Sequence, residues 1–187
     1  MGNNKDNEMF KKFTKYIERD GIDELVAYLD VIGYYKTPAS SSNHMSEEGG
    51  LLQHSINVTS TMFDLNSVLK ANITNESMAI VGLFHDIGKC SYYNKPLYIE
   101  NILKSGKRSE SKPYERNKEL LGIPHEVIAI QQLTKFIKLT EDEVFAIYYH
   151  NGLYTPSGYD LKNGGKETEL YLILHFSDLY SSRIIER

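Results

Sequence analysis

The segment LFHDIGKC, residues 83–90, places two metal-ligating side chains next to each other at the end of an apolar run. His85 supplies an imidazole nitrogen, Asp86 supplies a carboxylate, and a cation, Lys89, follows three residues after the carboxylate. Neighbouring residues on a helix point about 100° apart, so this pair could share a ligand only at a helix end or in a special geometry. The segment therefore indicates a polar site where a buried helix ends.

The histidines are distributed in a way that favours one shared site. A lone helical histidine is more often structural, but dinuclear carboxylate and histidine sites are built from ligands on several helices that converge in a bundle. Imidazole and carboxylate ligands suit divalent Mn, Fe, Co, Ni or Zn, and a ligand set without cysteine disfavours a structural zinc site. Five of the six histidines lie on different expected helices or at their ends: His54, His85, His125, His150 and His175.

The elements that must position these residues are nearly all expected to be helices. The apolar run MAIVGLF within residues 75–84 predicts a buried central helix. Thr140 and Glu143 form a capping-box pattern that starts a helix ending near His150. From apolar spacing and end signals, helices are expected over residues 10–17, 22–29, 51–65, 75–84, 124–137, 140–150 and 168–185.

Two segments interrupt this helical pattern. Residues 91–120 are polar and aromatic with weak alternation, so they could hold a short hairpin. The glycine, proline and asparagine content of residues 151–165 predicts a loop. With no repeat and no linker visible, we expect an all-α fold, a single helical-bundle domain over 1–187 with a small irregular or hairpin insertion around 91–120.

Composition narrows the possible classes of function. A net charge of −4 argues against a protein whose main task is to grip a long nucleic acid. No apolar stretch approaches the roughly 18 residues of a membrane span, and the polar first ten residues lack the apolar run of a secretion signal. The single cysteine, Cys90, excludes an internal disulfide and fits a reducing compartment, so a cytoplasmic location is expected.

On these residues the sequence resembles the HD-domain metal-dependent phosphohydrolases. The signature of that family is a histidine, a His-Asp doublet and a distant aspartate on a later helix. Members that bind two metal ions have two further histidines between the doublet and the last aspartate. The matching positions, in chain order, are His54, His85, Asp86, His125, His150 and Asp178.

Two longer stretches look like one branch of that family. TPASSSNHMSEEGGLLQHSINV (37–58) and TELYLILHFSDLYSS (168–182) are similar to segments of a branch containing 3′–5′ exoribonucleases and small phage or bacterial hydrolases. The exoribonucleases have an additional nucleic-acid-binding domain, whereas only about 35 residues precede the similar region, which covers roughly 35–185. The Gly-Tyr-Pro of relatives that cut cyclic dinucleotides is missing. The resemblance therefore favours hydrolysis of a stand-alone nucleotide.

The resemblance also implies roles for the ligand residues. Asp86 would bridge two ions, a water activated by metal would be the nucleophile, and Lys89 would offset charge on the phosphoryl oxygens. The number of ions, one or two, remains open, because His125 and His150 could instead bind substrate phosphate. The first ion would be held by His54, His85, Asp86 and Asp178, and the second by Asp86, His125 and His150.

Substrate contacts are expected from Lys89 and from four further residues. His44 matches a histidine of the related branch, Tyr149 and Tyr154 could stack on a base, and Arg108 belongs to a basic cluster that could grip phosphates. Each also has a plainer interpretation, as a loop histidine, core aromatics or a solvated charge. The expected substrate is a small nucleotide. The alternatives are a short single strand of RNA or DNA cut from its 3′ end, and nucleotide binding without turnover.

Overall fold

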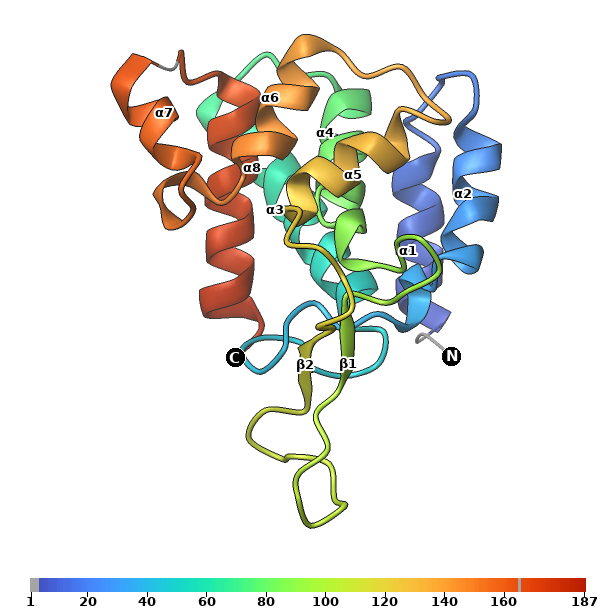
Figure 1. The fold of residues 1–187 in the computed structure, drawn as a ribbon. Coiled ribbons are helices and arrows are strands. Elements are labelled where there is room, and N and C mark those ends of the chain that lie inside the picture. Colours follow the sequence, from blue (N-terminus) through green and yellow to red (C-terminus); the bar gives the residue numbers. More distant parts are fainter. Residues whose placement is uncertain (1–3, 165) are drawn as a thin grey trace.

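Helices form most of the part of the chain that the structure, a computed structural model, describes: residues 4–164 and 166–187 (Figure 1). The helices are α1 (Asn4–Thr14), α2 (Ile22–Val31), α3 (Gly50–Leu69), α4 (Asn75–Phe84), α5 (His125–Leu133), α6 (Glu141–Tyr149), α7 (Gly158–Gly164) and α8 (Glu169–Tyr180). Two short strands, β1 (Tyr98–Glu100) and β2 (Tyr114–Arg116), form the one sheet of this region. The expected all-α fold is confirmed. Within the described residues, no helix has the length and apolar character needed to cross a membrane.

Helix α4 is the centre of the bundle, as its apolar sequence predicts. Every residue from Met78 to Phe84 is buried, and the helix begins at the side chain of Thr74, whose Oγ1 accepts a hydrogen bond from Ser77 N. Helix α3 packs against α4 and α8. A Cβ added to Gly82 would lie 2.5 Å from Thr59 Oγ1, so glycine allows α3 and α4 to approach closely. This contact brings the site residues of both helices together.

The insertion between α4 and α5 is the hairpin that the sequence allows. Strands β1 and β2 pair antiparallel, with Ile99 opposite Glu115, and the loop beyond them extends from the body of the protein (Figure 1). The base of the hairpin is joined to the loop between α2 and α3, because Tyr114 N donates to Ser41 O at 3.2 Å. The hairpin therefore begins beside the segment that carries His44.

Several expected boundaries differ from the structure. Helix α1 spans Asn4–Thr14 where 10–17 was expected, and α5 ends at Leu133 where the expected helix ends at 137. The prediction of a loop over 151–165 is wrong in part: Gly152–Tyr154 is a 3₁₀ turn and 158–164 form α7, while residue 165 lies outside the described residues. Buried Leu161 anchors this short helix, and Pro156 just before it is compatible with a helix start. The last helix is α-helical only to Tyr180 and continues as a π-helical turn, Ser181–Ile185.

Candidate metal centre

The end of α4 explains how an adjacent His-Asp pair can serve one site. His85 keeps helical dihedral angles as the C-cap, whereas Asp86 leaves the helix with φ −102° and ψ 7°. A 3₁₀ turn, Ile87–Lys89, then returns the chain so that Lys89 Nζ lies 2.5 Å from Asp86 Oδ2. The two ligands therefore diverge at the helix end while the lysine stays on the carboxylate.

Asp86 is the hub of the site, and its two oxygens face different histidines. Oδ2 lies 3.6 Å from His54 Nε2 and 3.4 Å from His85 Nε2. Oδ1 lies 3.1 Å from His125 Nε2 and 3.5 Å from His150 Nε2. The carboxylate thus separates four imidazoles, drawn from α3, α5 and the ends of α4 and α6, into two pairs. A carboxylate placed in this way could bridge two ions.

Asp178 on α8 completes the cluster. Its Oδ1 lies 3.2 Å from His54 Nε2, and its carboxylate forms a group with His85 and His150 in which the potential ligand atoms lie within 4.8 Å of one another. The structure therefore brings together all six residues expected to hold metal.

The ligand atoms are arranged for a cation. His85 Nδ1 donates to Gly82 O at 3.1 Å and His150 Nδ1 donates to Ile147 O at 2.7 Å, which leaves the lone pair on Nε2 in each ring. Several atoms that face the centre are buried without a hydrogen-bond partner among the described residues, an arrangement that costs free energy unless a cation satisfies them. These atoms are Nε2 of His54, His85 and His125 and Oδ1 of Asp86. The residues fit a divalent ion.

The ionised carboxylates of the site favour a cation, whereas His54 must release a proton to bind one. Burial opposes ionisation of Asp86, but Lys89 and the neighbouring imidazoles hold its pKa well below the ordinary value. Burial likewise opposes a charged His54, yet the nearby carboxylates of Asp178 and Glu186 raise its pKa to about 9. His54 therefore carries a proton at neutral pH that a bound cation would displace. Burial lowers the pKa of His85, which keeps that ring neutral and able to ligate.

Glu186 belongs to the site, although the sequence reasoning missed it. His54 Nδ1 lies 3.0 Å from both of its carboxylate oxygens, and Asn57 Nδ2 donates to Oε1 at 3.0 Å. The side chain has no exposed surface and so fixes the orientation of the His54 ring. Its one sequence signal is a spacing of eight residues from Asp178, which leaves it about 80° away on an ideal α-helix. The π-helical turn between the two residues alters that angle.

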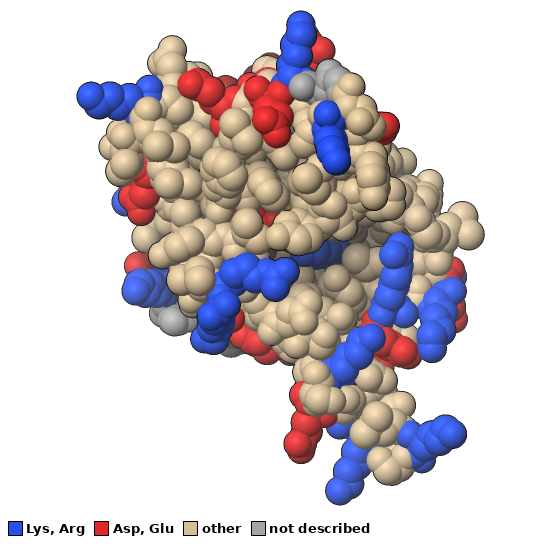
Figure 2. Space-filling model, turned by 90° about the vertical axis from the view of Figure 1, so that its left-hand side faces the viewer, with Lys and Arg blue, Asp and Glu red and all other residues tan. Residues whose placement is uncertain are grey.

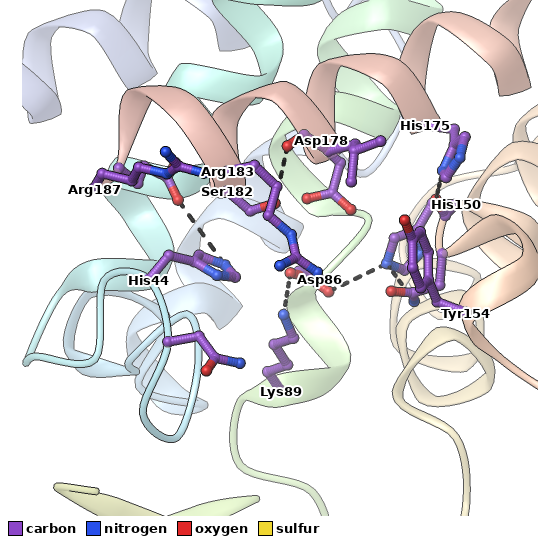
Figure 3. A pocket seen from close by; sticks show the side chains of 14 residues that line it. His44, Asp86, Lys89, His150, Tyr154, His175, Asp178, Ser182, Arg183 and Arg187 are labelled. Atoms are coloured by element: carbon purple, nitrogen blue, oxygen red, sulfur yellow. Dashed lines mark hydrogen bonds and ion pairs between the residues drawn. The ribbon is translucent and has the colours of Figure 1, made fainter. Parts of the chain in front are cut away.

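A pocket of about 400 Å³ opens onto the cluster (Figure 3). Of the residues expected to bind substrate, His44, Lys89 and Tyr154 line this pocket. Tyr149 does not line it and instead packs on Phe145, with ring centroids 4.7 Å apart.

Arg108 lies away from its expected substrate contact, and His175 contacts the backbone of a ligand histidine. Arg108 is on the hairpin, away from the lining of this pocket, where it pairs with Glu100 and lies over the ring of Tyr114 at 4.5 Å. His175 lines the pocket, but its Nδ1 donates to His150 O at 2.7 Å. It therefore supports the segment that carries His150.

Gly88 yields a stability prediction for the site. A Cβ at this position would lie 1.9 Å from His125 O and 2.8 Å from Ala129 N, so Gly88→Ala must push away the first turn of α5. We expect overpacking to cost about 1–3 kcal/mol of unfolding free energy and to displace His125. Denaturant unfolding and metal titration measure both effects. Gly122→Ala is the matched control, because nothing lies within 4 Å of its Cβ position. Equal stability of the two variants would contradict this account of the packing.

The fold and the cluster together define a helical, HD-like domain with buried histidine and aspartate side chains that could bind a metal ion. The family model of the HDOD domain matches residues 15–153, well over half of the chain. The chain therefore belongs to the HDOD domain family, which is related to the HD superfamily. The matched region includes His54, His85, Asp86, His125 and His150 and ends before Asp178.

Other comparisons give no nearer relative. No curated protein and no solved structure matches the chain significantly. The family match supports the HD relationship but not the exoribonuclease branch in particular, so that part of the resemblance stays a prediction.

Proposed function

We propose that the protein is a metal-dependent phosphohydrolase that cleaves a phosphoester or phosphoanhydride of a nucleotide or a similar small phosphorylated substrate. The observation that carries this proposal is the position of Asp86 between two pairs of histidines, at the floor of an open pocket. Divalent ions at these residues would supply an activated water and offset charge on the phosphoryl oxygens.

The chain itself supplies groups that fit a phosphate and a base. Lys89 lies at the floor of the pocket with 13% of its side chain exposed. Burial alone would lower the pKa of Lys89, but the Asp86 carboxylate outweighs burial and raises it. The ammonium group therefore stays charged and can pair with a phosphoryl oxygen. Tyr154 lines the same pocket and is 71% exposed, which leaves its ring free to stack on a base.

A non-catalytic role must be weighed, because HDOD domains are often without catalytic activity. A domain that only binds a nucleotide has no need for buried ligand atoms that face a common centre without partners. In the absence of an ion, such atoms cost stability. Here they are Nε2 of His54, His85 and His125 and Oδ1 of Asp86. Their presence, together with an open pocket, supports turnover over simple binding.

Cleavage of a short single strand of RNA or DNA from its 3′ end is a second candidate, supported by the charge of the hairpin. Residues 101–118 contain six lysines and arginines against two glutamates, which gives +6 − 2 = +4 in a chain whose net charge is −4. The hairpin is joined at its base to the loop that carries His44. A strand bound in the pocket could therefore also contact this basic segment.

A substrate panel tests the proposal. Purified protein is supplied in turn with Mn²⁺, Fe²⁺, Co²⁺, Ni²⁺ or Zn²⁺ and assayed on nucleoside phosphates and short oligonucleotides, with chromatographic identification of products. We expect metal-dependent release of phosphate or nucleoside from a small substrate. Release of mononucleotides, with activity that falls steeply with salt, would favour the exonuclease. A protein that binds nucleotides but hydrolyses nothing under any ion would overturn the proposal.

A further inference from the structure

The pocket contains two arginines whose charges the protein leaves unpaired. Arg183 and Arg187 both line it, and neither guanidinium makes an ion pair or hydrogen bond with another described residue. The other arginines differ. Arg19 pairs with Glu143, Arg108 pairs with Glu100, and the Arg116 guanidinium donates to a backbone carbonyl. The carboxylates that line the pocket are already engaged, Asp86 by Lys89 and both Asp178 and Glu186 by His54. The two guanidinium groups therefore remain available to bind an anion.

The C-terminal turn directs these arginines into the pocket. On an α-helix, each residue four positions further along is rotated by about 40° around the axis. Three side chains spaced by four would therefore turn progressively away from the pocket. From Asp178 onward, however, two such rows line the pocket together, because the chain changes to a π-helical turn with the i→i+5 bond Glu186 N to Ser181 O. The rows are Asp178, Ser182 and Glu186, and Leu179, Arg183 and Arg187.

The two arginines lie at different depths. Figure 3 shows Arg183 extending toward Asp86 and Lys89, whereas Arg187 lies at the edge of the pocket near His44. On the face seen in Figure 2, lysine and arginine side chains gather around a hollow in the surface. Arg183 and Arg187 therefore place positive charge at two different positions in the pocket.

We propose that Arg183 and Arg187 are the anion-binding residues of this pocket and that they select a substrate with a second phosphate group. This inference rests on the proposed function for the position of the reacting phosphate. That phosphate lies between the cluster, Lys89 and Arg183, and the second phosphate lies against Arg187. Guanidinium groups match phosphate oxygens in a two-point geometry, which suits them to this selection better than lysines.

Binding of two inorganic probes tests the inference without any turnover. Inorganic phosphate carries one phosphorus, and imidodiphosphate is a diphosphate whose bridging nitrogen resists hydrolysis. Their affinities for the Mn²⁺-supplied protein are measured by calorimetry. We expect Arg187→Gln to weaken imidodiphosphate about tenfold or more while leaving phosphate within about twofold, and Arg183→Gln to weaken both about tenfold. Lys12→Gln, which removes an exposed charge on α1, is the control and is expected to change neither.

The outcomes separate this inference from the proposed function. Selective loss of imidodiphosphate binding in a protein that hydrolyses nothing would support the inference and refute the function. Hydrolysis with unchanged binding in both arginine variants would support the function and refute the inference. Equal weakening of both probes by Arg187→Gln would overturn the second phosphate subsite. Thermal unfolding midpoints accompany each variant, and since both side chains are exposed we expect them to stay unchanged.

Discussion

Asp86→Asn is expected to reduce kcat/KM by at least about a thousandfold, because each of its carboxylate oxygens faces a different pair of histidines. Asparagine preserves the size of the side chain but offers one neutral oxygen in place of two charged ones. Both ions should therefore bind more weakly. The variant should lose metal as well as activity, which metal analysis of the purified protein measures.

The matched control makes the same aspartate-to-asparagine substitution at a position away from the metal centre. Asp64→Asn removes an exposed carboxylate from α3, the helix that carries His54, and is expected to retain full activity and metal content. If Asp86→Asn kept the activity of the wild-type protein on its best substrate, the assignment of the metal centre would be wrong. Loss of activity with unchanged metal content would instead contradict the bridging role of Asp86.

Arg19→Met is expected to lower the unfolding free energy by about 3 kcal/mol, the largest effect we predict on stability. Arg19 binds Glu143 through two hydrogen bonds, Nη1 to Oε2 at 2.6 Å and Nη2 to Oε1 at 2.7 Å. The Glu143 side chain has no exposed surface, so the variant leaves a buried carboxylate without its cation. The lower end of the usual range applies because Arg19 itself is 17% exposed. Denaturant unfolding measures the change.

The same pair predicts how stability depends on pH. Burial alone would raise the pKa of Glu143. Hydrogen bonds from Arg19, Thr140 and Ser77 outweigh burial, so the pKa lies below the ordinary value of 4.5. A depressed pKa in the folded state stabilises the protein above the unfolded-state pKa. This contribution is lost as the pH falls from about 4.5 through the lower folded-state pKa. In Arg19→Met the acid-dependent loss should shrink.

A double variant distinguishes this ion pair from simple loss of packing. Arg19→Met with Glu143→Gln removes the buried charge and keeps an oxygen that can accept the hydrogen bond from Thr140 N. We expect it to recover much of the stability lost in Arg19→Met. If the single variant lies within about 0.5 kcal/mol of wild type, or if the double variant is no better, the ion pair does not stabilise the fold as described.

The sequence was informative where one physical signal dominated. The apolar run of residues 78–84 specified a buried helix, and the Thr140 capping box marked the start of α6. Both are local patterns, so they could be recognised without the fold. The six ligand residues could be grouped because their types and order resemble a known family, and the structure brings them together.

What the sequence could not predict depends on geometry that builds up over several turns. Glu186, Arg183 and Arg187 look like an ordinary charged C-terminus, and they enter the pocket only because α8 continues as a π-helical turn. Nothing in residue types marks that change. Tyr149 shows the opposite case, since an aromatic residue next to a ligand was expected to face the substrate but packs against Phe145.

Diffraction from crystals grown with Mn²⁺, recorded at the manganese absorption edge, would test the bridging centre most directly. We predict two anomalous peaks on either side of the Asp86 carboxylate, one beside His54, His85 and Asp178 and the other beside His125 and His150. The same crystals would show whether Lys89 leaves Asp86 once ions are bound. The absence of any peak at Asp86, with manganese bound elsewhere or nowhere, would contradict the metal centre on which the proposed phosphohydrolase depends.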